Sequence, residues 1–166
     1  MIVLSKTSYK TPVGILYLIA DEQILLAAGF TSFSELTKRL SPLDASRKSE
    51  TVGQIPVISD LIADYFNGET SALNSIKVRQ SGPAFSQSVW KEMRKVPVGK
   101  TWSYAELAKR AGSASAVRAV GSACANNLVA PIIPCHRIVK SGGALGNYAY
   151  GEEVKEWLLR HEGALQ

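Results

Sequence analysis

The chain has 166 residues, a formal net charge of +5 and a hydrophobic content of 46%. This length allows one large domain or two small ones, each with a substantial core. No apolar run approaches the roughly 20 residues of a bilayer span, and the first residues lack the basic and long apolar stretches of a secretory signal. We therefore expect a cytoplasmic protein without a membrane span.

The positive charge is concentrated in the second half of the chain. Residues 1–76 hold six Lys or Arg against eight Asp or Glu, whereas residues 77–166 hold thirteen against six. Such an excess favours a polyanionic partner for the second half, although mild basicity more often serves solubility alone.

The first half predicts a small antiparallel sheet followed by two helices. Three short β-rich runs, at 2–4, 15–19 and 24–27, alternate with turn signals. Helical patterns follow at 33–40 and 56–66, separated by a polar stretch at 41–53 that indicates an exposed loop. Residues 67–81 have the composition of a linker, so we expect domains at 1–78 and 79–166.

The second half is expected to be mostly helical. An apolar pattern predicts a helix over 83–95, and Ser103 with Glu106 forms a capping box for a helix through about Arg110. A glycine turn leads to a further helix at about 115–125, giving the form of a helix-turn-helix unit or of an ordinary helical hairpin. A final amphipathic helix at 152–163 is expected to bury Val154, Trp157, Leu158 and His161.

The helix at 115–125 is unusually narrow. Its small residues permit close approach to another helix, which is their commoner use, or to a nucleic-acid groove. Arg118 favours the second use, because a buried helix face seldom carries an unpaired arginine.

The pair Cys135-His136, between Pro134 and Arg137, indicates covalent chemistry. A thiol needs a base or a positive environment to ionise at neutral pH. Adjacent side chains of an extended strand point to opposite faces, so His136 reaches Cys135 only if the chain bends or a water bridges them. With only two Cys and two His in the chain, no zinc ligand cluster can be assembled, and we expect reduced thiols, no metal and no cofactor.

These residues resemble the active-site motif of the O6-alkylguanine-DNA alkyltransferase family. The resemblance runs from about Phe85 to Gly163 and is weak before residue 80, where it depends mainly on Thr11-Pro12-Val13-Gly14. It implies an α+β fold: an N-terminal RNase H-like antiparallel sheet with helices, then a mostly helical domain containing a winged-helix-like helix-turn-helix. It also implies irreversible transfer of an alkyl group from guanine O6 in DNA, and less efficiently from thymine O4, to Cys135.

The resemblance assigns roles to single residues. Cys135, His136 and Glu162 would form a water-bridged relay, Tyr104 would donate to the purine, and Asn127 would belong to the hinge before the active segment. In DNA binding it implies Arg118 as an intercalating finger, together with Ser103, Ala116, Ala119 and Gly121. The residues it implies in the base pocket are Ile138, Tyr148, Ala149 and Tyr150. From the residues alone, we would expect Glu162 at a solvated helix end, Tyr104 as a half-buried surface tyrosine that covers the core, and Asn127 as a turn residue.

The chain also departs from the family pattern. Ala149 stands where many relatives have serine, and Tyr150 where they often have glycine, so we expect poor reaction with benzyl-type adducts. Two further departures are Val117, in the helix at 115–125, and Leu128, in the hinge. The expected partner is duplex DNA containing O6-alkylguanine, bound by a monomer with no membrane contact.

Three other functions remain as alternatives. An alkyltransferase-like protein that binds lesions without accepting the alkyl group would lack Cys135. A cysteine hydrolase would need a better placed base than His136, with His161 the only substitute. A regulator that used the helix-turn-helix alone would not need the thiol.

Overall fold

The computed structural model describes residues 2–166 and divides into two compact units. The first unit runs to Ser81 and takes in Leu128–Ile132, while the second comprises Gly82–Asn127 and Ile133–Gln166. The chain therefore returns to the first unit for five residues shortly before Cys135, a feature that no composition change in the sequence marks. Within residues 2–166, no helix is long and apolar enough to span a bilayer.

The sheet of the first unit has the strand order β4-β1-β2-β3-β5. Strands β1 (Leu4–Thr11), β2 (Gly14–Asp21) and β3 (Ile24–Gly29) form the predicted antiparallel sheet. The predicted position of the first strand is wrong, since β1 begins where the predicted run at 2–4 ends. Two short strands, β4 (Ser49–Thr51) and β5 (Lys77–Val78), add to its edges in parallel, so the sheet is mixed rather than purely antiparallel.

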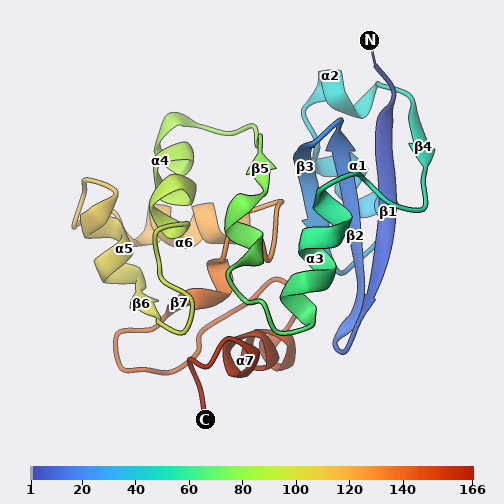
Figure 1. Cartoon of the computed structure of the whole chain (residues 1–166). Coiled ribbons are helices and arrows are strands. Elements are labelled where there is room, and N and C mark those ends of the chain that lie inside the picture. Colours follow the sequence, from blue (N-terminus) through green and yellow to red (C-terminus); the bar gives the residue numbers. More distant parts are fainter. Residues whose placement is uncertain (1) are drawn as a thin grey trace. The chain divides into compact units, whose positions relative to one another are not determined.

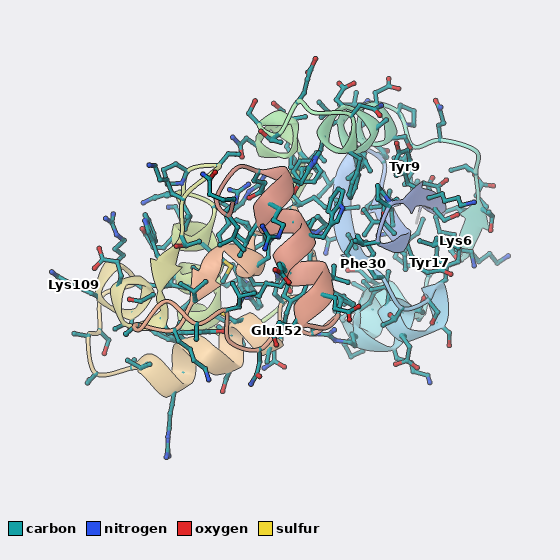
Figure 2. The ribbon with its side chains drawn as sticks, turned by 90° about the horizontal axis from the view of Figure 1, so that it is seen from below. Lys6, Tyr9, Tyr17, Phe30, Lys109 and Glu152 are labelled. Carbon is teal, nitrogen blue, oxygen red and sulfur yellow. The ribbon has the colours of Figure 1, made fainter. Side chains whose placement is uncertain are left out.

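Helices α1 (Phe33–Arg39) and α3 (Ile58–Phe66) confirm the two predicted helices of the first half. They cover opposite faces of the sheet (Figures 1 and 2), which explains why five of the six residues of β3 are buried. The core between these layers is aliphatic, with Leu16, Leu25 and Ile62 fully buried.

Two further predictions for this unit are wrong. The expected loop at 41–53 contains helix α2 (Pro42–Ala45) as well as β4, and the expected linker at 67–81 contains a 3₁₀ turn, η1 (Ala72–Ser75), as well as β5. Ser41 caps α2 by accepting a hydrogen bond from the Asp44 amide, and β4 is a fully exposed polar edge strand. Short elements of this kind carry no hydrophobic period from which they can be predicted.

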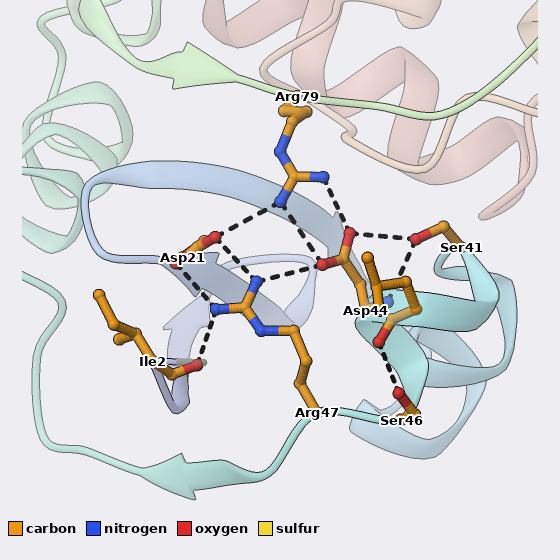
Figure 3. A network of polar contacts seen from close by, with 8 residues as sticks. Ile2, Asp21, Ser41, Asp44, Ser46, Arg47 and Arg79 are labelled. Carbon is orange, nitrogen blue, oxygen red and sulfur yellow. Dashed lines mark hydrogen bonds and ion pairs between the residues drawn. The ribbon is translucent and has the colours of Figure 1, made fainter.

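An ionic network joins separate segments of the first unit (Figure 3). The guanidinium of Arg47 pairs with Asp21 at 2.8 Å and Asp44 at 3.1 Å, and donates to the Ile2 carbonyl at 2.7 Å. Arg79 pairs with Asp44 at 2.9 Å and with Asp21 at 3.4 Å. The network thus fixes the segment just after β5 to the end of β2 and to α2.

We expect Asp44→Asn to destabilise the protein by about 2 kcal/mol, because Asp44 is 6% exposed and its charge-assisted bonds to two arginines would be weakened. The hydrogen bond from Arg79 lowers the pKa of Asp44, and that from Arg47 lowers the pKa of Asp21. Since both folded pKa values lie below the unfolded ones, this stabilisation is present above about pH 4 and is lost as the pH falls further. Urea titrations at pH 7 and pH 3 measure both effects, and an unchanged acid sensitivity in the variant would contradict the assignment.

The second unit contains helices α4 (Ala84–Met93), α5 (Tyr104–Arg110), α6 (Val117–Ala125) and α7 (Glu152–His161). Helices α4, α5 and α6 pack on one another (Figure 1), around Val89, Leu107 and Val120. A two-residue strand, β6 (Trp102–Ser103), pairs in parallel with β7 (Ile138–Val139). This pairing places the start of α5 beside the segment that follows Cys135.

The helical predictions for this unit are confirmed to within about two residues at each end. Ser103 caps α5 by accepting from the Glu106 amide at 3.0 Å, while the Glu106 carboxylate pairs with Arg110. The predicted inner face of the last helix is confirmed only at Leu158, which is buried, since Val154, Trp157 and His161 are half-buried. Lys155, Leu159 and, just after the helix, Glu162 complete the buried face. The sequence does not indicate that this face is buried, because a charged lysine is expected at a solvated position.

Candidate active site

The segment that carries Cys135 is bent. Pro134 has φ −85° and ψ 65°, and the Cys135 amide donates to the Ile133 carbonyl at 2.9 Å, which together form an inverse γ-turn. Cys135–Arg137 then form a single 3₁₀ turn, η2, before β7. Cys135 and His136 are therefore not alternate residues of an extended strand, and the geometric objection to their cooperation does not apply.

Cys135 is a free thiol that is 8% exposed. Asn127 donates from Nδ2 to Cys135 Sγ at 3.3 Å and to the Ile133 carbonyl at 2.8 Å, so one amide fixes both the thiol and the turn before it. Burial raises the pKa of Cys135, while the Asn127 hydrogen bond and the positive charge of Lys155 act in the opposite direction. The thiolate thus needs a proton acceptor as well as these two neighbours.

His136 and Glu162 form a fully buried pair, with 2.8 Å between His136 Nε2 and Glu162 Oε2. Arg137 clamps the same carboxylate through Nε at 2.8 Å and Nη2 at 3.1 Å, and its Nη1 donates to the Val96 carbonyl at 2.9 Å. Burial alone would raise the pKa of Glu162, but the hydrogen bonds from His136 and Arg137 and the positive charge of Arg137 act against burial and hold that pKa below its usual range. Glu162 is therefore an anion, and not a solvated helix end.

This arrangement determines the tautomer of His136. Burial lowers the pKa of His136 in spite of the nearby carboxylate, so the ring is neutral. An ionised carboxylate can only accept, which requires Nε2 to carry the proton and leaves the lone pair on Nδ1. Nδ1 is buried and has no hydrogen-bond partner among residues 2–166, so its lone pair is available to accept a proton.

A cavity of about 760 Å³ opens onto Cys135. Its walls come from α5, α6 and the glycine-rich segment before α7, and its lining includes Tyr104, Arg118, Gly121, Cys124, Lys140, Asn147, Tyr148 and Ala149. Burial, followed by the two nearby cysteines, raises the pKa of Tyr104 to about 12, so its hydroxyl stays protonated and can donate. A Cβ atom added at Gly146, whose φ is +78°, would lie 3.5 Å from the Tyr104 ring, so the glycine-rich segment passes close to this ring.

Helix α6 presents its narrow face outward. Arg118 and Ala119 are exposed, while Ala116 and Gly121 are half-buried, and a Cβ atom added at Gly121 would meet nothing within 4 Å. The absence of a side chain at Gly121 is therefore not required for packing within the second unit, and space remains for an external molecule along this face.

The structure brings together most of the residues singled out from the sequence. Tyr104, Arg118, Gly121, Tyr148 and Ala149 surround the cavity with Cys135. Asn127 contacts the thiol, and His136, the next residue in the chain, pairs with Glu162. Ile138 is buried outside the cavity lining, and Tyr150 contacts the ring of Tyr148 edge-on at 5.6 Å. Ser103, Ala116 and Ala119 also lie outside the lining.

Sequence reasoning missed two charged residues of the site. Lys155 is fully buried, with Nζ donating to the Ile138 carbonyl at 2.6 Å and to the Asn147 carbonyl at 3.3 Å, so it joins β7 to the glycine-rich segment. Arg137 belongs to the sequence motif, but the sequence does not indicate that its guanidinium binds the Glu162 carboxylate. The available signal was the spacing of Lys155, Leu159 and Glu162, which places all three on one helix face.

Comparison with known proteins identifies the family. A family model described as "6-O-methylguanine DNA methyltransferase, DNA binding domain" matches residues 84–164. The methylated-DNA–protein-cysteine methyltransferase of Shigella flexneri is 36% identical over 171 residues, covering 99% of both chains. The chain belongs to the methylated-DNA–protein-cysteine methyltransferase family. The member from Methanosarcina acetivorans is 34% identical, over 94% of this chain and 96% of its own.

Solved structures of the methyltransferase family agree with this membership. The Mycobacterium tuberculosis O6-methylguanine methyltransferase superposes with a TM-score of 0.79 at 28% identity, covering 98% of this chain and 94% of that one. The M. tuberculosis OGT in complex with DNA gives a TM-score of 0.81 at 29% identity, covering 96% and 93%. The mixed α/β fold is therefore that of the methyltransferases, and the stretch matched by the family model contains Cys135, His136 and Glu162.

Proposed function

We propose that this protein repairs DNA by transferring a methyl group from the O6 atom of guanine in duplex DNA to Cys135. The observation that carries the proposal is the arrangement around the thiol: Asn127 donates to Sγ, and the neighbouring His136 is held neutral with its free nitrogen buried. Family membership and the likeness to a DNA-bound relative support the same conclusion. We also propose that the protein is intracellular and acts on DNA as a monomer.

The proposed chemistry is a single displacement. A water between Cys135 and His136 Nδ1 passes the thiol proton to the imidazole, and Glu162 stabilises the imidazolium that results. The thiolate attacks the methyl carbon, the bond between that carbon and guanine O6 breaks, and its electron pair remains on the purine. Tyr104, still protonated, donates to the purine and stabilises this charge.

The product explains why each molecule would react once. A thioether has no carbonyl carbon for water to attack, so Cys135 would remain methylated. The protein is then consumed in proportion to the lesions repaired. O4-methylthymine, which presents a similar alkyl ether on a smaller ring, is proposed as a poorer substrate.

A base stacked in a duplex cannot reach a thiol that is 8% exposed, so we propose that the nucleotide is flipped into the cavity. Helices α5 and α6 would act as a helix-turn-helix unit whose narrow second helix enters the minor groove. Arg118, exposed on α6 and at the rim of the cavity, would fill the vacated stack, with Ser103, Ala116, Ala119 and Gly121 close to the backbone.

Intact mass spectrometry tests the proposal directly. After incubation with a duplex containing O6-methylguanine, the protein is expected to gain one methyl group, mapped to Cys135, and to gain none in Cys135→Ser. Cys124→Ser provides a matched control, expected to gain the methyl group, because Cys124 is the other thiol that lines the cavity. Tight binding of the duplex without a change in mass would instead indicate a protein that only recognises lesions.

We expect benzyl adducts to react at least about tenfold more slowly than methyl adducts. The side chain of Tyr150 packs against Tyr148, a residue of the cavity wall, and restricts how far that wall can move. Tyr150→Gly is expected to raise the benzyl rate with little effect on the methyl rate. Single-turnover assays on the two duplexes check this, and equal rates in the unaltered protein would refute it.

A further inference from the structure

The cavity beside Cys135 is positively charged. Among the residues that the structure describes, two cations and no carboxylate line it. Arg118 comes from α6, and Lys140 comes from the loop that follows β7. The other lining residues are uncharged while the thiol is protonated. A concave surface with charges of one sign concentrates their field, so this cavity is expected to attract anions.

The backbone of Lys140 is held in a tight turn. Its amide donates to the Ala144 carbonyl at 2.9 Å, and its carbonyl accepts from the Gly143 amide at 2.9 Å. Gly143 has φ +88°, which favours glycine at this point of the turn. Lys140 also follows β7 directly, and β7 is paired with β6. The side chain of Lys140 therefore begins at a fixed place on the cavity wall.

The stem of the Lys140 side chain lies near Tyr104. A Cβ atom added at Gly146 would be 3.5 Å from Lys140 Cγ and 3.6 Å from the Tyr104 hydroxyl, so both side chains converge on this glycine. Lys140 as a whole is exposed. A lysine of this kind lays its methylene groups along a surface and keeps its ammonium group in water. The charge of Lys140 thus belongs to the open side of the cavity.

A flipped nucleotide would bring its phosphates to the same open side. Its base has to reach Cys135, which is only 8% exposed, whereas the phosphates on either side of the nucleotide continue into the duplex. Arg118 is proposed to fill the vacated stack, which leaves Lys140 as the other cation of the cavity. A lysine ammonium group binds phosphate as a point charge and needs no fixed planar geometry.

We propose that Lys140 binds one of the two phosphates that flank the flipped nucleotide and so holds the nucleotide at the cavity. The inference rests on the proposed function in taking this cavity as the place that receives the lesion. It adds a contact to a single, local phosphate, which differs from a general attraction between a basic protein and DNA.

The test is a binding titration with the full chain in a Cys135→Ser background, in which the lesion stays intact. Three duplexes contain O6-methylguanine and differ only in the linkage next to it: phosphate on both sides, an uncharged methylphosphonate on the 5′ side, or one on the 3′ side. Lys140→Met removes the charge, and Lys140→Arg keeps it. Lys109→Met is the matched control, because Lys109 is an exposed lysine of α5 outside the cavity lining.

On the all-phosphate duplex, Lys140→Met is expected to weaken binding about threefold to tenfold and to reduce the slope of log affinity against log salt by about 0.9. On one methylphosphonate duplex, the same substitution is expected to change the affinity by less than about 1.5-fold, because the partner charge is already absent. Lys140→Arg is expected to stay within about twofold of the parent on every duplex. Any loss in Lys109→Met is expected to be equal on all three.

The proposal is overturned if Lys140→Met weakens binding equally on all three duplexes, as a contact to the purine or a general effect of charge would do. It is also overturned if Lys140→Met weakens binding on none of them. Should Lys140→Met fail to fold, the parent protein decides, because equal affinity for all three duplexes would mean that neither flanking phosphate is bound. Absence of methyl transfer in the unaltered protein would refute the proposed function alone, since these titrations need no transfer.

Discussion

Glu162→Gln is expected to lower the free energy of unfolding by about 3 to 5 kcal/mol, as loss of one charge from a buried ion pair does. Arg137, only 3% exposed, would lose the carboxylate that it contacts twice. Methyl transfer is expected to slow by about a hundredfold or more, because the amide no longer selects the His136 tautomer with a free Nδ1.

Urea unfolding measures the first effect, and single-turnover assays corrected for the folded fraction measure the second. Glu156→Gln is the matched control on the same helix. Its ion pair with Arg160 is exposed, so a change of about 1 kcal/mol or less is expected. Normal transfer by folded Glu162→Gln would show that Glu162 does not set the His136 tautomer that accepts the proton.

Asn127→Ala is expected to slow methyl transfer by about 10-fold to 100-fold. The hydrogen bond from Nδ2 to a thiolate is charge-assisted, and such bonds contribute about 1.5 to 3 kcal/mol. Because this bond lowers the pKa of Cys135, its removal moves the pH dependence of transfer to higher pH.

Asn126→Ala provides the control for this variant, since Asn126 is exposed at the end of α6. The pH profile of single-turnover transfer is the decisive measurement. A slower rate with an unshifted profile would mean that Asn127 shapes only the turn at Ile133 and does not act on the thiol.

The reactive centre was predictable because its chemistry is local in sequence. Cys135 and His136 are adjacent, Pro134 indicates a change of direction, and the helices that carry Tyr104 and Arg118 have clear caps and periods. The resemblance to the family supplied Glu162, which spacing alone had described as solvated.

Other parts of the site could not be predicted, for a physical reason. The burial of Lys155 depends on two carbonyl groups, of Ile138 and Asn147, that no side-chain pattern reveals. Elsewhere in the fold, within the first unit, the contact of Gln80 with Leu128 joins residues 48 positions apart through one backbone amide. Backbone acceptors and donors are the same at every residue, so sequence carries no signal for them.

The five residues Leu128–Ile132 limit how far the two units are separable modules. A chain that begins at Gly82 would contain every residue proposed to act in methyl transfer, yet it would lack β3, along which Val129 and Ala130 are almost completely buried. An apolar strand without its sheet edge is an aggregation hazard. Exchange of either unit between relatives, by recombination or by design, would therefore have to preserve the match between this short strand and the sheet that receives it.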